Sequence, residues 1–483
     1  MSRRRYCFCV FCAIAAAVLA ALMTAPTVRA ADAPVSFIRD VAPILKENCF
    51  ACHDAKKKSG KFDMTTFEKL SAGGSNGEPI APGKPAESDL HVLMTSADEK
   101  RMPPKDKGDA VPKEKAAVVA RWIAEGAKLD AGIDPKADLV KELRVRWVPP
   151  APQEKYTNAA VVNALCFTPD GQHLVVGGYH ELTIWDPAAG KLLKRIATRA
   201  QRAYGLVFLP DGKLACAGGR PGQEGDVRIY DISAAAKETK DGVEYLDGVN
   251  DPKVLVKHLV DTDDSILCLA LSPDGKHIAA GGTDRTVRVW DVADGFKLEQ
   301  SIENHADWVL GVAFTGNGKY LLTAGRDKTA KVWDLVAKES VMTFPEHQAI
   351  VYGVAAKPDG SVGFSVGADK QVRTWKPGGE GKQLKAVGGH GDEVFKVAFS
   401  PKGNLLATAS ADKSVRLWDP DKLANTKTLG GLTDWVYAVA FSPDGKKLAA
   451  GGFEGIVCVW TVPDGKPACT FCASPGYAGK KSQ

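Results

Sequence analysis

The chain has 483 residues, of which 45% are hydrophobic and 25% charged. This composition excludes a chain that is disordered throughout, and the length predicts more than one domain because single cores usually stop growing near about 250–300 residues. The formal net charge is +5, and the first 30 residues contribute four arginines to it. The remaining chain is close to neutral, which argues against nucleic-acid binding, since that function needs a concentrated basic surface.

Residues 1–30 have the pattern of a signal peptide. Three arginines precede an apolar run over residues 6–23, and the tripeptide VRA at residues 28–30 fits a cleavage site before Ala31. We therefore predict an exported protein of the periplasm or cell envelope, with no membrane span after signal cleavage. An uncleaved membrane anchor is the alternative, because the apolar run is close to the lower length limit for a span.

The stretch NCFACHD contains the pattern C-x-x-C-H at Cys49, Cys52 and His53. Thioether bonds from the two cysteines would attach one covalent haem c, and His53 would be the proximal ligand of the haem iron. A zinc site is the first alternative, but it needs a second ligand pair, and none lies between residues 54 and 150. A thioredoxin-like redox pair is the second, but the preceding residues 37–45 have apolar positions at helical spacing rather than a strand pattern.

An electron-carrying haem needs a methionine or histidine as its sixth ligand. The candidates between residues 54 and 150 are Met102, Met64, Met94 and His91. Two prolines directly follow Met102 and would hold its sulfur in a stiff, extended loop. Met94 lies in the apolar pattern LHVLM, which is typical of a core. We therefore predict Met102 as the distal ligand of the haem iron, with Met94 and His91 as alternatives.

Residues 112–129 predict a further helix, with a proline at its start and a glycine close to its end. With this helix in place, residues 37–127 resemble the cytochrome c-like domain of planctomycete secreted proteins. The matching pieces are DVAPILKENCFACH, GGSNGEPIAPGKPAESDL, RMPP and RWIAEGA. The resemblance implies a small all-α haem domain, which we place at residues 31–130, with haem bound through Cys49, Cys52 and His53. A linker over residues 131–155 follows.

From residue 156 the chain repeats seven times a tight turn such as PDG followed by a tryptophan or tyrosine endpoint, mostly 42 to 45 residues apart. This period is typical of four-stranded propeller blades, and the units resemble WD repeats. The resemblance implies a hydrogen-bonded tetrad in three blades, which makes their histidines structural. The expected members are His305, Thr323, Asp327 and Trp333 in blade four, His347, Ser365, Asp369 and Trp375 in blade five, and His390, Thr408, Asp412 and Trp418 in blade six.

We therefore expect a multidomain protein in which a small all-α cytochrome c-like domain precedes an all-β seven-bladed WD-repeat propeller at residues 156–475, with a tail at 476–483. The excess length between Tyr230 and Trp290 predicts a surface loop. Ring closure is ambiguous, because either the C-terminal stretch KPACTFCA or the upstream stretch KELRVRWV could supply the last strand.

Cys166, Cys216, Cys268 and Cys458 lie in strand patterns, which indicates apolar packing. Cys469 and Cys472 repeat the C-x-x-C spacing, but Ala473 follows them, so we expect no second haem there. A disulfide among these cysteines is the open alternative.

These features favour electron transfer through a His/Met-ligated haem, with the propeller as the scaffold for a protein redox partner or an envelope protein complex. The alternative is an envelope scaffold whose haem is auxiliary or a redox sensor. An enzyme with its site in the propeller funnel is less favoured, because the sequence has no second metal-ligand cluster and no nucleophile elbow. We assign no catalytic residue.

Overall fold

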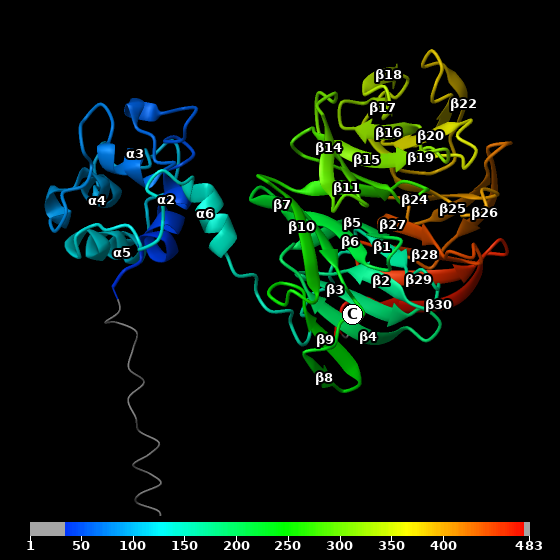
Figure 1. Cartoon of the computed structure of the whole chain (residues 1–483), viewed down its shortest axis with the longest axis horizontal. Helices are drawn as coiled ribbons and strands as arrows, with labels where there is room; N and C mark the ends of the chain where they lie inside the picture. The colour runs from blue at the N-terminus through cyan, green and yellow to red at the C-terminus, as the bar shows by residue number, and fades with distance from the viewer. Residues whose placement is uncertain (1–33, 478–483) are drawn as a thin grey trace, which may run out of the picture. The chain divides into compact units, whose positions relative to one another are not determined.

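The computed structural model describes residues 34–477, and the expected signal peptide lies outside them. The described chain divides into two compact units, one ending at Trp147 and the other beginning at Val148. The first unit is helical and the second is all-β (Figure 1). The expected fold class is therefore confirmed.

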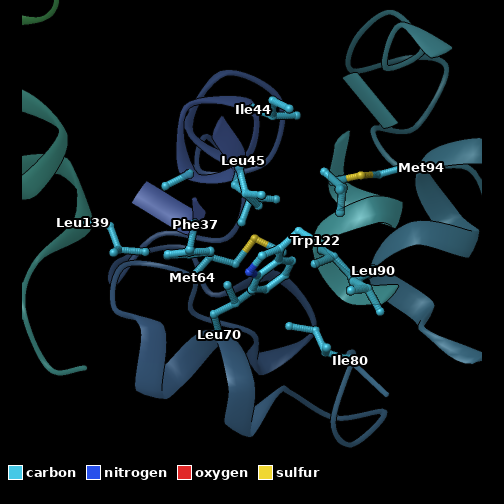
Figure 2. Close-up of a cluster of buried hydrophobic side chains, with 14 of the residues drawn as sticks. Phe37, Ile44, Leu45, Met64, Leu70, Ile80, Leu90, Met94, Trp122 and Leu139 are labelled. Atoms are coloured by element: carbon cyan, nitrogen blue, oxygen red, sulfur yellow. The ribbon is translucent and has the colours of Figure 1, made fainter. Parts of the chain in front are cut away.

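The first unit consists of short helical segments joined by long loops. They are η1 (Phe37–Val41), α2 (Ala42–Asn48), η2 (Ser59–Lys61), α3 (Phe67–Ala72), η3 (Pro85–Glu87), α4 (Asp89–Thr95), α5 (Lys113–Ala124) and α6 (Leu139–Arg146). Apolar side chains from these segments meet in one core, in which Phe37, Leu45, Leu70 and Trp122 are almost fully buried (Figure 2). The ring centroids of Phe37 and Trp122 are 5.1 Å apart. The helical spacing predicted before the C-x-x-C-H pattern is thus confirmed.

Helix α6 lies in the stretch that the sequence indicated as a linker or a closing strand. Asp138 caps its N-terminus by accepting hydrogen bonds from the backbone N–H groups of Val140 and Lys141, at 2.9 and 3.1 Å. Leu139 is 1% exposed and belongs to the core around Phe37. The helical unit therefore extends to Trp147, because this apolar anchor folds the segment back onto the core.

The second unit is a propeller of seven sheets (Figure 1). In each blade the first strand in chain order is the innermost. Blades one to three contain β1 (Leu165–Phe167), β2 (Leu174–Gly177), β3 (Glu181–Asp186) and β4 (Lys191–Ala197); β5 (Arg202–Phe208), β6 (Leu214–Arg220), β7 (Glu224–Tyr230) and β10 (Leu255–Thr262); and β11 (Ile266–Leu271), β12 (His277–Gly282), β13 (Val287–Asp291) and β14 (Lys297–Ile302).

Blades four to seven are built from consecutive strands. They contain β15 (Val309–Phe314), β16 (Tyr320–Gly325), β17 (Ala330–Asp334) and β18 (Glu339–Phe344); β19 (Val351–Ala356), β20 (Gly363–Gly367), β21 (Val372–Trp375) and β22 (Gln383–Val387); β23 (Val394–Phe399), β24 (Leu406–Ser410), β25 (Val415–Asp419) and β26 (Ala424–Leu429); and β27 (Val436–Phe441), β28 (Lys447–Gly452), β29 (Ile456–Thr461) and β30 (Lys466–Cys472).

The excess length after Tyr230 forms a β-hairpin rather than the predicted surface loop. Its strands are β8 (Glu238–Lys240) and β9 (Val243–Asp247), and β9 pairs in parallel with β4, the outer strand of blade one. Blade one therefore has six strands, and the chain returns to blade two through β10. The hairpin covers an edge strand that would otherwise present unpaired backbone groups.

The ring closes by packing of blade seven against blade one. Strand β30 is the outer strand of blade seven, so the C-terminal alternative is correct, and the upstream stretch is helix α6. Inner strands β1 and β27 are in contact, and the backbone N–H of Val162 donates to the carbonyl of Gly452 at 3.0 Å. The rings of Trp185 and Phe471 stack across the seam with centroids 4.8 Å apart. Side-chain packing therefore closes the ring without exchange of a strand between the two blades.

The complete hydrogen-bonded tetrad occurs in blades five and six. In each, the histidine ring lies 2.9 Å from the turn aspartate and 2.7 Å from the strand hydroxyl, and the tryptophan indole donates to that hydroxyl at 3.0 or 2.8 Å. The network satisfies polar groups that are buried between strands. Its members are His347, Asp369, Ser365 and Trp375 in blade five, and His390, Asp412, Thr408 and Trp418 in blade six.

The tetrad predicted in blade four is incomplete. His305 bonds to Asp327 at 2.9 Å and to Thr323 at 2.7 Å, as expected. The indole of Trp333, however, donates to the side-chain oxygen of Gln300 at 3.0 Å. Gln300 lies on the outer strand β14 of the neighbouring blade three, so a long amide side chain from the next blade takes the place of the hydroxyl.

We expect Asp412→Ala to lower the free energy of unfolding of the propeller by about 1–3 kcal/mol, because it leaves the buried ring of His390 without an acceptor. Burial acts to raise the pKa of Asp412, but hydrogen bonds from Ser414, Gly391 and His390 lower it to about 2. The stabilisation is therefore present above the pKa of an unfolded aspartate, near about 4, and is lost as the pH falls toward 2. Denaturant unfolding measured at several pH values checks both statements.

The matched control is Glu454→Ala in blade seven, where the corresponding carboxylate is exposed and accepts from Thr433. Its effect should stay within about 0.5 kcal/mol. Equal effects of the two variants would contradict the role assigned to Asp412.

Candidate functional site

The C-x-x-C-H motif lies in a tight turn at the C-terminal end of α2. The backbone N–H of Cys49 donates to the carbonyl of Leu45 at 2.8 Å, which continues the helical bonding by one residue. The N–H groups of Cys52 and His53 both donate to the carbonyl of Cys49, at 3.1 and 3.0 Å. Residues three and four positions apart in such a turn share one side of the backbone. The two thiols and the imidazole therefore project to the same side.

That side faces a cavity of about 390 Å³ in the helical unit. Cys49, Cys52, His53 and Met102 all line it, and so do apolar side chains that include Leu90. The volume is within the range of about 300–1,000 Å³ typical of small-molecule and cofactor sites. The structure therefore brings all four predicted site residues to one mostly apolar cavity.

The donor groups in this cavity are suited to a covalently held haem. Burial, together with the neighbouring Cys52, raises the pKa of the Cys49 thiol to about 12, so the thiol is uncharged at neutral pH. The buried Nδ1 atom of His53 has no hydrogen-bond partner among residues 34–477. The ring nitrogens of the propeller histidines His347 and His390, by contrast, are all hydrogen-bonded. His53 thus differs from these propeller histidines, whose rings belong to structural networks.

The structure also separates the candidates for the second axial ligand. His91 does not line the cavity, and its Nδ1 atom lies 3.3 Å from the carbonyl oxygen of Pro85. Met64 and Met94 do line the cavity, but they are 3% and 4% exposed and belong to the hydrophobic core (Figure 2). Met102 is 38% exposed and lies outside that core. Its thioether is therefore the one that does not contribute to core packing.

Backbone hydrogen bonds hold the loop that carries Met102. The N–H of Met102 donates to the carbonyl of Leu93 at the end of α4, at 2.9 Å. The guanidinium of Arg101 donates to the carbonyl of Gly108 at 2.9 Å and so ties the two ends of the loop together. The loop presents Met102 and the two prolines that follow it to the cavity.

A second candidate site lies on the propeller, at the end where the inner strands begin. Six inner strands carry a β-bulge near their first residue, and a bulge re-aims the side chain of the extra residue. The six extra residues are Tyr204, Leu267, Leu310, Tyr352, Phe395 and Tyr437. Four of these six are aromatic.

Five aromatic side chains form a continuous cluster at this end, across blades five to seven. Ring centroids lie 5.1 Å apart between Tyr352 and Phe395, 5.0 Å between Phe395 and Tyr437, and 6.2 Å between Phe395 and Trp435. Phe453, at the end of β28, is 6.4 Å from Trp435. Trp435 and Phe453 are 46% and 49% exposed. We call these five residues the aromatic cluster, and it is an apolar surface of the kind that marks interaction sites.

Charged groups border the aromatic cluster. The hydroxyl of Tyr352 donates to Glu393 at 2.8 Å, and burial together with this carboxylate raises the pKa of Tyr352. On blade four the guanidinium of Arg326 lies 4.6 Å from the ring centroid of the exposed Trp308. This site was not predicted from the sequence. The recurring aromatic residue near the start of each inner strand, as in VYGVAA, VFKVAF and VYAVAF, is the signal that could have revealed it.

In the described part of the chain, no group of three or more His, Cys, Asp or Glu side chains is arranged to hold a metal ion. The same residues contain no helix with the length and apolar character needed to cross a membrane.

Comparison with known proteins identifies both units. Residues 49–106 match the family described as Planctomycete cytochrome C. Six segments match the WD domain, G-beta repeat, at residues 152–186, 253–291, 296–334, 338–376, 381–419 and 424–461. The resemblances stated from the sequence are therefore confirmed. The strands β5, β6 and β7 of blade two, which ends this run with Tyr230 in place of tryptophan and is interrupted by the hairpin β8–β9, lie outside the matched segments.

Two curated proteins illustrate the relationship. Protein groucho of Drosophila melanogaster is 28% identical over 144 residues, which are 29% of this chain and 17% of that protein. Transducin-like enhancer protein 2 of Mus musculus is 29% identical over 137 residues, which are 27% of this chain and 15% of that protein. The match thus spans less than a fifth of either relative.

Proposed function

Since the chain joins a planctomycete-type cytochrome c domain to a WD-repeat propeller, we propose that it is an exported monohaem protein that transfers single electrons to or from a protein partner held by its propeller. The observation that carries the proposal is the cavity lined by Cys49, Cys52, His53 and Met102. In this assignment Cys49 and Cys52 hold one haem c covalently, and His53 and Met102 ligate its iron.

The bound haem would supply one-electron exchange, and the residues of this chain would determine how it is used. Two cysteines in the same tight turn as His53 keep the imidazole close to the ring. Leu90, Leu93 and the two prolines after Met102 line the cavity, and these apolar groups would limit the access of water to the bound haem. His53 and Met102 would together hold the haem iron, which would raise its reduction potential and leave no open position for a substrate. The arrangement therefore suits an electron carrier better than a reaction centre.

The propeller has the part of a binding scaffold in this proposal. The aromatic cluster gives it an exposed apolar surface, and aromatic residues are enriched at protein–protein interfaces. The alternative function is that of an envelope scaffold whose haem senses redox state. Under either function we propose a location in the periplasm or cell envelope. The signal-peptide pattern of residues 1–30, together with the attachment of c-type haem outside the cytoplasm, supports this location.

Replacement of Met102 by alanine distinguishes an electron carrier from an open haem. We expect the full-length protein to show a low-spin c-type spectrum in the reduced state and a single one-electron redox transition. Met102→Ala should convert the iron to a high-spin form that binds carbon monoxide, and it should lower the midpoint potential, because the thioether stabilises the reduced iron. Visible spectroscopy with and without carbon monoxide, combined with a redox titration, measures all three properties.

The control is Met94→Leu, a substitution of similar volume in the core. It should leave the spectrum unchanged. An unchanged spectrum for Met102→Ala would overturn the axial assignment, and a wild-type protein that is already high-spin would favour the sensor function.

A further inference from the structure

Lys396 has a long side chain at a position where the other five bulged inner strands have a glycine, an alanine or a cysteine. It is the first residue that pairs in the ladder after the bulge of β23. The corresponding residues of the other five bulged strands are Gly205, Cys268, Gly311, Gly353 and Ala438. Space at this position is limited between the strands, because a Cβ atom on Gly311 would lie 3.1 Å from the Cα atom of Gly353 in the next inner strand.

Lys396 lies on β23, the inner strand of blade six, and its ammonium is within electrostatic range of a group on another inner strand. Its electrostatic partner is the thiol of Cys268, which lies on the inner strand β11 of blade three. Strand β23 belongs to blade six, and its neighbours in the ring are β19 and β27. Because β23 and β11 are not adjacent, the two groups interact across the central channel that propeller blades surround.

Lys396 has no counter-ion among residues 34–477. No described carboxylate lies within ion-pair or hydrogen-bond distance of its ammonium. Burial lowers the pKa of Lys396, and the one group that opposes this shift is Cys268, a thiol whose own pKa burial raises to about 12. The two carboxylates that precede Lys396 in the sequence have other partners: Glu393 accepts a hydrogen bond from the hydroxyl of Tyr352, and Asp392 forms an ion pair with Lys370 at 3.3 Å. A cation that is partly removed from water without a partner lowers stability.

The aromatic cluster adjoins this cation at the start of β23. Phe395 of the cluster is the residue before Lys396 in the same strand, and Trp435 and Phe453 are exposed beside it. A ligand that covers these rings must be largely apolar, and the part that enters the channel must be anionic to pair with Lys396. A protein segment combines the two requirements, because apolar side chains and one carboxylate can be placed along the same extended backbone.

We propose that this end of the propeller binds an extended protein segment that inserts an aspartate or glutamate side chain into the channel toward Lys396. The proposal rests on the scaffold role proposed above and specifies the chemistry of the partner. Lys396 supplies the charge that recognises the carboxylate, and the aromatic cluster supplies the apolar contact area. An ammonium–carboxylate hydrogen bond in a partly dehydrated site is stronger than a neutral one.

Selection of short random peptides, displayed on phage, against the full-length holoprotein tests the proposal. We expect the selected peptides to be enriched in aspartate or glutamate at one position next to apolar residues. Lys396→Met should weaken their binding by about 10- to 100-fold, as expected for loss of a hydrogen bond between charged groups. Replacing the peptide carboxylate by its amide should cause a similar loss in the wild type and a loss of less than about twofold in Lys396→Met.

Two further variants make the outcomes distinct. Lys402→Met removes an exposed lysine from the turn after the same strand and should not change binding. Trp435→Ala removes part of the aromatic cluster and should weaken every selected peptide. Peptides that depend on Trp435 but bind Lys396→Met within about twofold of the wild type overturn the carboxylate proposal and leave the scaffold role intact. A selection that yields no peptide, or peptides indifferent to both residues, overturns binding at this end altogether.

The folding of the variant is not a confounding factor. Lys396→Met replaces an unpaired, partly buried cation by an apolar side chain of similar length, so its thermal midpoint should equal or exceed that of the wild type. A lower midpoint would show that Lys396 has a structural partner, and it would overturn the proposal.

Discussion

A chain in which Cys49 and Cys52 are both replaced by alanine should carry no covalently attached haem. Both thiols line the cavity of the helical unit, and the turn at the end of α2 projects them to the same side as His53. Without the two thioether bonds, any haem that enters the cavity is held by axial ligands alone and is lost on denaturation. Haem staining of a denaturing gel and the pyridine haemochrome spectrum measure the loss, which we expect to be complete.

The chain contains its own matched control. Cys469 and Cys472 repeat the C-x-x-C spacing, but Ala473 follows them, and they lie on the outer strand β30 of blade seven. Their replacement by alanine should leave the covalent haem unchanged. The thermal transition of the propeller should be unaffected in Cys49→Ala/Cys52→Ala, because the two units have separate cores. A variant that keeps covalent haem, or a wild type without it in a host that attaches c-type haem, would contradict the haem assignment.

Arg195→Met should destabilise the propeller by about 3–5 kcal/mol, because it leaves a carboxylate buried without its cation. Arg195 donates two hydrogen bonds to Glu181, at 2.7 and 2.9 Å, and the side chains are 2% and 0% exposed. Its guanidinium also donates to the carbonyl of Gln153 at 2.6 Å, and the hydroxyl of Tyr156 donates to Glu181 at 2.5 Å. The pair therefore anchors the segment that enters the first blade. Denaturant unfolding followed by tryptophan fluorescence measures the loss.

The pH dependence of this variant provides a second test. Burial raises the pKa of Glu181 even though Arg195 and Tyr156 lower it. A carboxyl group with a raised pKa in the folded state contributes stability at low pH that is lost as the pH rises through that pKa. Removal of Arg195 strengthens this trend, so the deficit of Arg195→Met should be smaller at pH 5 than at pH 8. A deficit that does not change with pH would mean that the carboxylate is not the source of the instability.

Two controls separate the buried pair from charge loss in general. Replacing both Arg195 and Glu181 by methionine should recover most of the stability, since no charge is then left buried. Lys240→Met breaks the exposed ion pair with Glu154, whose side chains are 54% and 81% exposed, and should cost less than about 1 kcal/mol. A Lys240→Met effect as large as that of Arg195→Met would contradict the importance of burial.

The buried pair also suggests why the hairpin β8–β9 pairs with blade one. The ring of Tyr245 on β9 lies 5.7 Å from the guanidinium of Arg195, and Lys240 on β8 pairs with Glu154 at 2.6 Å. The hairpin therefore contacts the entering segment from the outside. The composition of this stretch indicates only that it is polar and contains turn residues, which is why a loop was expected. Its pairing with β4 depends on an edge strand some 50 residues earlier, and no local pattern contains that information.

Local patterns predicted the features that local chemistry determines. The spacing of Cys49, Cys52 and His53 is enough to predict that their side chains project to the same side, because one helical turn contains all three residues. The seven blades are predicted by a period that repeats along the chain. The tetrads of blades five and six follow from side chains within one blade. In blade four the same reasoning was wrong about Trp333, because Gln300 reaches it from the neighbouring blade.

The sequence by itself determined the two-unit organisation, the haem-attachment motif and the seven blades, because each depends on residues that are close together in the chain. Tertiary structure alone decided that α6 belongs to the helical unit, that blade seven closes on blade one, and that the aromatic cluster forms beside Lys396, which has no ion-pair partner among residues 34–477. It also brought Met102 to the cavity that contains His53. These arrangements depend on packing and hydrogen bonding between segments far apart in sequence, which hydrophobic periodicity and turn chemistry do not specify.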